Sequence, residues 1–141
     1  MRKIPNLLDA GLFTDERGKL GVLEGDSLPF PVRRMYYLYD VPTGMTRGEH
    51  GHKRLEQVLL CIHGSCEIEL TDSRRSFVFK LDSPCVALHI PPGYWRRLVF
   101  HTPGTICCVL ASLPFDRDDY IYSYAEFETW AKARQTGAVS A

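Results

Sequence analysis

One segment, residues 44–64, reads GMTRGEHGHKRLEQVLLCIHG and places two histidines one residue apart. Successive side chains of an extended strand point to opposite faces, so His50 and His52 are expected to leave the same face. Glu56 follows four residues after His52 and is expected on that face as well. Two imidazoles and a carboxylate that converge from one strand can either hold a metal ion or transfer protons.

The spacing of these residues resembles the first conserved motif of the cupin superfamily. In that motif Gly44 precedes the two histidines, Glu56 follows them, and Gly64 closes the pattern. The resemblance implies an all-β fold, a cupin-type β-barrel (jelly roll). In cupins that bind a metal, the two histidines and the glutamate are ligands.

A second segment, PPGYWR at residues 91–96, resembles the second cupin motif, which supplies a further histidine in the metal-binding members. Here Arg96 occupies the position of that histidine. Arginine stays protonated and has no lone pair, so it cannot ligate a metal, and its charge would oppose a bound cation. We therefore predict no metal and interpret the pocket as an acid/base or anion-stabilising site.

Composition indicates one soluble globular domain over residues 1–141, because 45% of the residues are hydrophobic and 24% are charged. The absence of a membrane-length apolar run and of a signal-peptide pattern predicts a cytoplasmic protein without a membrane partner. Lys+Arg and Asp+Glu each number 17, which argues against a nucleic-acid partner. The five cysteines show no paired C-x-x-C spacing and are expected to be buried and reduced.

Short runs of β-branched, aromatic and alternating apolar residues predict about eight strands, as in a sandwich or barrel. A hairpin is expected around the turn 15–18. The other predicted strands cover residues 32–41, 55–62, 66–70, 75–81, 85–90, 94–100 and 105–112. The last two are expected to form a hairpin through residues 101–104.

Only the end of the chain shows helical periodicity, over residues 117–134. We predict one short C-terminal α-helix there, capped by Asp116 or Asp118, with an aromatic stripe that serves as core or subunit contact. Residues 135–141 carry no pattern and are expected to form a mobile tail.

Several motifs in the same order narrow the resemblance to one family. They are RGEHGHK at residues 47–53, LEQV at 55–58, LDSP at 81–84, the Pro-Gly-Trp run ending at Trp95, LAS at 110–112 and DYI at 119–121. Together they resemble the sugar 3,4-ketoisomerases, the FdtA or WxcM-like cupins that act on dTDP-4-keto-6-deoxyglucose. The resemblance implies a metal-independent homodimer without a cofactor, and it departs from many members at Arg96, where they carry histidine.

Moving a ketone from C4 to C3 requires a base that removes the C3 proton and an acid that protonates C4 of the resulting enediolate. Histidine can do both near neutral pH. We interpret His52 as the principal base and His50 as the partner that shuttles the proton or contacts a sugar oxygen. Arg96, Arg47 and the Tyr37 hydroxyl are the candidate donors to the enediolate oxygens.

The remaining predicted contacts concern the sugar and the nucleotide. The family resemblance places Arg17 near the sugar with Arg96, where both influence the face on which C4 is protonated. Arg34 and Lys53 are candidates for the diphosphate because cationic side chains suit phosphate oxygens. Trp95 is a candidate stacking residue, and Glu56 and Arg47 are counted among the substrate-binding residues.

Three alternatives stay open from the sequence. A metal cupin, such as a dioxygenase or a metal-dependent isomerase, would use His50, His52 and Glu56 as ligands. A non-catalytic sugar-binding cupin would keep the pocket without turnover. A deoxysugar 3,5-epimerase would share fold and substrate. The nucleotide and the C4 configuration of the product also stay open.

Overall fold

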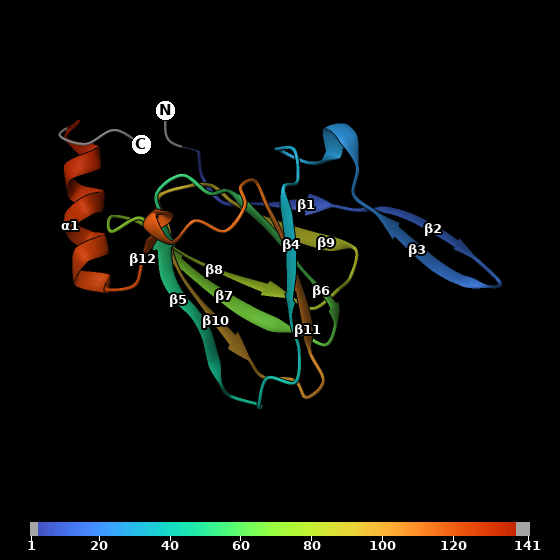
Figure 1. Cartoon of the computed structure of the whole chain (residues 1–141). Coiled ribbons are helices and arrows are strands. Elements are labelled where there is room, and N and C mark those ends of the chain that lie inside the picture. The colour runs from blue at the N-terminus through green and yellow to red at the C-terminus, as the bar shows by residue number, and fades with distance from the viewer. Residues whose placement is uncertain (1–2, 138–141) are drawn as a thin grey trace.

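The computed structural model describes residues 3–137, which form two facing antiparallel β-sheets and one C-terminal helix (Figure 1). One sheet has the strand order β1-β9-β6-β11-β4 and the other the order β12-β5-β10-β7-β8. A separate hairpin consists of β2 and β3. The strands are β1 (Asn6–Asp9), β2 (Gly11–Asp15), β3 (Gly18–Val22), β4 (Arg34–Leu38), β5 (Thr46–His52), β6 (Gln57–His63), β7 (Cys66–Thr71), β8 (Ser76–Leu81), β9 (Val86–Ile90), β10 (Trp95–Phe100), β11 (Ile106–Ala111) and β12 (Tyr120–Ile121). The helices are the 3₁₀ turns η1 (Gly25–Ser27) and η2 (Arg117–Asp119) and the α-helix α1 (Tyr124–Gln135).

The chain crosses between the two sheets at most connections after β5, which is how a jelly roll is built. The expected all-β fold with one C-terminal helix is confirmed, with the barrel formed by two separate facing sheets. The predicted hairpin of β10 and β11 is wrong, because β10 pairs with β5 and β7 whereas β11 pairs with β4 and β6. Both strands turn an apolar face inward, so they face each other across the core.

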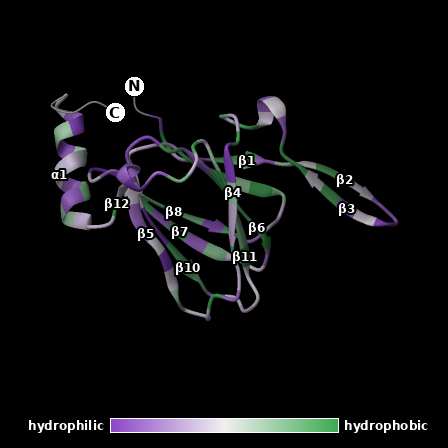
Figure 2. Ribbon diagram, viewed as in Figure 1, coloured by the Kyte–Doolittle hydropathy of each residue, from purple (hydrophilic) through white to green (hydrophobic). Residues whose placement is uncertain are grey.

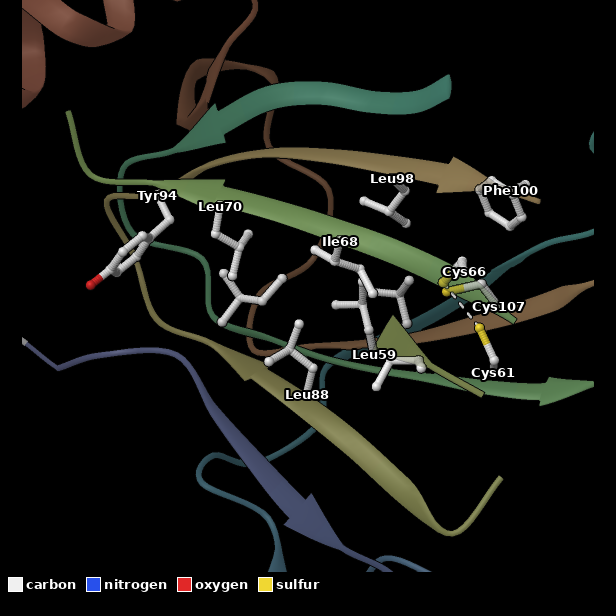
Figure 3. Close-up of a cluster of buried hydrophobic side chains, with 13 residues drawn as sticks. Leu59, Cys61, Cys66, Ile68, Leu70, Leu88, Tyr94, Leu98, Phe100 and Cys107 are labelled. Atoms are coloured by element: carbon white, nitrogen blue, oxygen red, sulfur yellow. Dashed lines mark hydrogen bonds between the residues drawn. The ribbon is translucent and has the colours of Figure 1, made fainter. Parts of the chain in front are cut away.

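The space between the sheets is filled by apolar side chains from both of them (Figure 3). Leu59, Ile68, Leu88 and Leu98 lie near the middle of this cluster and are almost fully buried. Strand β6 is buried on both faces, because Val58 packs on a second cluster with Phe30. Hydrophobic residues accordingly gather on strands such as β6 and β9, whereas β5 and the turn η2 are largely hydrophilic (Figure 2).

Helix α1 begins later than the sequence predicts. Ser123 is its N-cap and accepts a hydrogen bond from the Glu126 backbone N–H, whereas Asp116 caps the turn η2. Phe127 of α1 packs directly on Gly51, where an added Cβ would lie 2.7 Å from the phenyl ring. The glycine between the two histidines therefore lets the helix rest on the back of β5.

The β2–β3 hairpin projects away from the sandwich (Figure 1). It confirms the predicted turn, and Gly18 closes that turn at a φ of 126°. Leu12, Phe13 and Leu20 are 48–64% exposed on it. No residue of this projecting hairpin belongs to the core clusters of the sandwich.

The predicted tail at residues 135–141 is only partly covered by the described residues. Gln135 is the last residue of α1, and its side-chain amide donates hydrogen bonds to the Asp72 carbonyl and the Ser73 hydroxyl. Residues 138–141 lie outside the described part. Within residues 3–137, no helix has the length and hydropathy needed to cross a lipid bilayer.

Candidate active site

The two histidines lie side by side at the end of β5, as the spacing predicts. Their Nε2 atoms are 3.0 Å apart. His52 Nδ1 lies 3.0 Å from the Asp119 carboxylate, and both of these residues are almost fully buried. The result is a continuous chain of hydrogen-bonding groups from Asp119 through His52 to His50.

Asp119 is held in place by the backbone around it. It accepts hydrogen bonds from the backbone N–H groups of Arg54 (2.7 Å) and Leu55 (3.3 Å). The next residue, Tyr120, pairs with His52 in the ladder between β12 and β5. Burial raises the pKa of Asp119, but hydrogen bonds from His52 and the Arg54 amide lower it overall, so the carboxylate stays ionised.

Both histidines are neutral at physiological pH. Burial, assisted by the charge of Arg96, lowers the pKa of His50 to about 2 and that of His52 to about 4. Because the Asp119 carboxylate can only accept, His52 carries its proton on Nδ1 and presents a lone pair on Nε2. His50 then donates its Nε2–H to His52. The lone pair of His50 is then on Nδ1. No residue within 3–137 donates a hydrogen bond to this atom.

A cavity of about 150 Å³ opens between the sheets next to His50. Its apolar floor consists of Leu38, Leu59, Leu98 and Val109. Its polar wall consists of His50, Arg34, Tyr36, Arg47, Gln57, Arg96 and Tyr120. His52 lies behind this wall, so His50 is the histidine that faces the cavity.

Arg96 is a buried cation beside this histidine. The ladder between β10 and β5 pairs Arg96 with His50, and the arginine is only 2% exposed. Its guanidinium donates to the Gln57 side-chain carbonyl and, at 3.1 Å, to the Tyr94 backbone carbonyl. Burial lowers the pKa of Arg96 to about 10, which leaves it charged. No carboxylate within residues 3–137 is at ion-pair distance, and its Nε has no partner there, so Arg96 can stabilise an anion in the cavity.

Two polar residues that we did not predict as site residues extend this network. Gln57 donates from its amide nitrogen to the Tyr36 hydroxyl at 2.9 Å while its carbonyl accepts from Arg96. Tyr36 is on the inward face of β4, and burial raises its pKa. The cavity thus holds a connected set of donors opposite the histidine.

Two other predicted residues line the cavity, Arg34 and Arg47. The Arg34 guanidinium lies over the rings of Tyr36 (4.6 Å) and Phe115 (5.4 Å). Its terminal nitrogens are 3.5 Å from the Tyr120 hydroxyl. Tyr120 also packs its ring on both histidines and was not predicted as a site residue.

Tyr37 and Glu56 do not face the cavity, which corrects two expectations. Alternation along β4 turns Tyr36 inward and leaves Tyr37 55% exposed on the outer face. The Glu56 carboxylate lies 3.0 Å from Nε2 of His89 instead of joining the two histidines. Strand β6 begins only at Gln57, after a turn, so the alternation that orients His52 does not continue to Glu56.

Trp95, Lys53 and Arg17 also lie outside the cavity. Trp95 is on the outer face of β10, where its ring contacts Tyr124 of α1 at 5.4 Å. Lys53 donates its backbone N–H to the Asp119 backbone carbonyl, but its side chain does not line the cavity. Arg17 is in the β2–β3 turn, where its 85% exposed side chain pairs with Asp15.

The donor set does not fit a metal ion. Only His50 and His52 of the expected ligands converge, because Glu56 points away. The fourth position holds the protonated guanidinium of Arg96, which repels cations. The residues present instead fit proton transfer next to a stabilised anion.

Comparison with known proteins agrees with this geometry. The family model described as FdtA, WxcM-like, C-terminal, matches residues 3–132. A TDP-4-oxo-6-deoxy-alpha-D-glucose-3,4-oxoisomerase from Aneurinibacillus thermoaerophilus is 38% identical over 117 residues, which cover 82% of this chain and 84% of the relative.

Two solved structures are also similar. The 3,4-ketoisomerase of Helicobacter canadensis is 37% identical with a TM-score of 0.87, and the match covers 91% of this chain and 97% of that one. A mutant of the 3,4-ketoisomerase QdtA from Thermoanaerobacterium thermosaccharolyticum, in complex with TDP-4-keto-6-deoxyglucose, is 36% identical with a TM-score of 0.89. That match covers 95% of this chain and 98% of the other. The chain therefore belongs to the FdtA family of WxcM-like proteins.

Proposed function

We propose that this protein is a nucleotide-sugar 3,4-ketoisomerase that converts dTDP-4-keto-6-deoxyglucose to a dTDP-3-keto-6-deoxyhexose in deoxysugar biosynthesis. The observation that carries the proposal is a neutral histidine, His50, and a buried cation, Arg96, that face one cavity. The relatives support the choice of substrate, since one is named for this reaction and another was solved with TDP-4-keto-6-deoxyglucose.

The first step is removal of the C3 proton, which the C4 carbonyl acidifies. His50 is the base, because its Nδ1 has the lone pair and the residue lines the cavity. This reverses the roles that the sequence suggested for the two histidines. His52 is a positioning residue, since it lies behind the cavity wall.

The proton is then shared along the chain of hydrogen bonds. When His50 accepts a proton on Nδ1, it can pass its Nε2 proton to Nε2 of His52. This moves the positive charge away from Arg96 and toward the Asp119 carboxylate, which lowers the energy of the protonated state. The proton that His50 holds exchanges with water before the relay runs in reverse in the second half of the reaction, so the proton delivered to C4 comes from solvent.

The second step is protonation of C4. Removal of the C3 proton leaves an enediolate whose charge is spread over O3 and O4, and the buried Arg96 stabilises that charge. His50 returns a proton to C4, while the O3 hydroxyl proton is transferred to O4. C3 becomes the ketone, and the electrons balance within the sugar, so the reaction needs no redox cofactor.

We also propose a homodimer. The outer face of the sheet that ends in β4 exposes Met35, Tyr37, Tyr39 and Ile62 around a cleft of about 550 Å³. A contiguous apolar surface of this kind is typical of a subunit contact. The projecting hairpin adds a second apolar surface. Its Arg17 does not line the cavity of its own chain, so in this proposal it meets the sugar in the cavity of the other subunit.

The dimer makes a prediction about the hairpin. Phe13→Asp places a charge on its 64% exposed apolar side chain and is expected to shift the protein from dimer to monomer. Sedimentation velocity at several concentrations measures the change, with Lys19→Asp on the same hairpin as the control. Wild-type protein that sediments as a monomer would contradict the proposal.

The compartment proposed is the cytoplasm. All five cysteines are free thiols, which is usual in a reducing compartment.

Direct conversion tests the reaction. Purified protein is incubated with dTDP-4-keto-6-deoxyglucose in the presence of a chelator, and the sugar ring is followed by NMR. A 3-keto product supports the ketoisomerase. Binding of the substrate without conversion would indicate a non-catalytic cupin, and conversion only after metal addition would indicate a metal-dependent enzyme.

Asp119→Asn is expected to lower kcat by roughly 10- to 100-fold, because the amide can donate to His52 Nδ1 and reverse the direction of the relay. The effect on KM should be small, since Asp119 does not line the cavity. Steady-state kinetics measure the effects on kcat and KM separately, and NMR of the imidazole nitrogens reports the tautomer of His52. An unchanged kcat would remove Asp119 from the relay.

The pH dependence follows from the lowered pKa values of the histidines. A base must be unprotonated, so kcat/KM is expected to stay nearly constant from about pH 8 to about pH 5. Activity should fall only as the pH approaches the pKa of His52, about 4, because a protonated His52 cannot accept the proton that His50 relays, and not near the ordinary value of 6.5. Circular dichroism at each pH separates loss of activity from unfolding. A midpoint near 6.5 would contradict the neutral, buried pair.

A further inference from the structure

Three cysteines gather at one end of the core, near Phe100 (Figure 3). Cys61 is on β6, Cys66 on β7 and Cys107 on β11. Their sulfur atoms all lie within 4.8 Å of one another, and each residue is at most 1% exposed. None of the three lines the cavity, so the proposed isomerisation does not use them.

One pair of these sulfur atoms joins residues of different sheets. Sγ of Cys61 and Sγ of Cys66 are 3.0 Å apart across the sandwich. A disulfide bond is about 2.05 Å long, so a shift of about 1 Å would bring the two atoms to bonding distance. Cys107 is instead the neighbour of Cys61 within one sheet, as its ladder partner.

The connection between the two cysteines is tightly fixed. Gly64 has a φ of 76°, and a Cβ at this position would lie 2.3 Å from the Thr105 hydroxyl. That hydroxyl accepts a hydrogen bond from the Ser65 backbone N–H and donates to the Ser65 carbonyl or the Thr102 carbonyl. The short turn therefore holds the two sulfur atoms toward each other before any reaction.

We propose that Cys61 and Cys66 form a redox pair that closes to an intramolecular disulfide on exposure to hydrogen peroxide. The Cys61 thiolate attacks one peroxide oxygen to give a sulfenic acid, and the other oxygen leaves as water after protonation. The Cys66 sulfur then attacks the sulfenic sulfur and releases the second water. Two thiols lose two hydrogen atoms, and one peroxide is reduced to two waters.

The surroundings favour this product. Hydrogen bonds from Cys107 and Cys66 lower the pKa of Cys61, which identifies it as the attacking thiol. The neighbouring side chains are apolar, so they accommodate a neutral disulfide better than a charged metal–thiolate centre. Hydrogen peroxide is small and uncharged, so it can enter a buried site that excludes larger oxidants such as disulfide compounds.

Peptide mapping tests the pairing, because trypsin releases Cys61 and Cys66 within one peptide, residues 55–74. Cys85 falls in peptide 81–96, and Cys107 and Cys108 fall in peptide 98–117. The folded protein is treated with hydrogen peroxide, quenched in acid, alkylated under denaturing conditions without reductant, and digested. We expect the mass of peptide 55–74 to be lower by two hydrogen atoms and the peptide to carry no alkyl group. If the oxidised protein is reduced before alkylation, both cysteines should carry an alkyl group.

Variants define the partner. Cys107→Ala is expected to form the same disulfide, and Cys85→Ala serves as the control outside the cluster. Recovery of peptide 55–74 with both cysteines alkylated would overturn the proposal, as would a cross-link between peptides 55–74 and 98–117. The readout is mass alone on the wild-type protein, so it does not depend on the proposed isomerase activity.

Discussion

His50→Asn is expected to lower kcat by about 10²- to 10⁴-fold, the range typical for loss of a general acid–base group. Asparagine has no basic lone pair, so neither removal of the C3 proton nor its return to C4 can occur through this position. The change is measured by NMR of product formation under saturating substrate. Substrate binding should persist, because Arg34, Arg47 and Arg96 still line the cavity.

His101→Asn is the matched control, since His101 is in an exposed loop and should leave kcat unchanged. His52→Asn gives a second comparison. In the proposed relay it should be less damaging than His50→Asn, because His50 would still face the substrate. If His52→Asn abolishes turnover while His50→Asn retains it, the original assignment from the sequence holds and the geometric one is wrong.

Arg96→Met is expected to lower kcat by about 10²- to 10³-fold, the usual cost of losing one preorganised group at a developing oxyanion. Methionine keeps most of the side-chain volume but removes the charge next to His50. Because the same charge helps to lower the pKa of both histidines, those pKa values should rise in the variant. The acid limb of the activity profile should therefore move to higher pH.

Arg97→Met is the control one residue further along β10. Arg97 points outward and pairs with Glu69 at 2.9 Å on the surface, where ion pairs contribute little. The two variants remove the same charge from opposite faces of one strand. Similar kinetic losses in both would show that the effect of Arg96 does not depend on the cavity.

The strands and the histidine pair could be predicted because they depend on local alternation. His50 and His52 belong to one regular strand, so a period of two residues is sufficient to orient them. The same rule failed when it was carried from His52 across a turn to Glu56. Counting back from the buried Leu59 would have placed Gln57 on the inward face.

Other parts of the site depend on long-range pairing that the sequence does not encode locally. Asp119 and Tyr120 reach the histidines because β12 pairs with β5, although their segment shows helical periodicity. The choice between Tyr36 and Tyr37 depends on which residues of β4 point inward. Two adjacent tyrosines do not reveal this, because one of them points inward whichever way the strand is turned. The Asp119–His52 contact could not have been inferred from spacing either, because it depends on the pairing of β12 with β5.

The most direct measurement of the central claim is the position of deuterium after incubation with dTDP-4-keto-6-deoxyglucose in D2O. The account predicts a 3-keto product with deuterium at C4 at early times for the wild-type enzyme, and none for His50→Asn with substrate bound. Deuterium at C5 instead would indicate an epimerase. Incorporation at C4 by His50→Asn at the wild-type rate would contradict the role of His50.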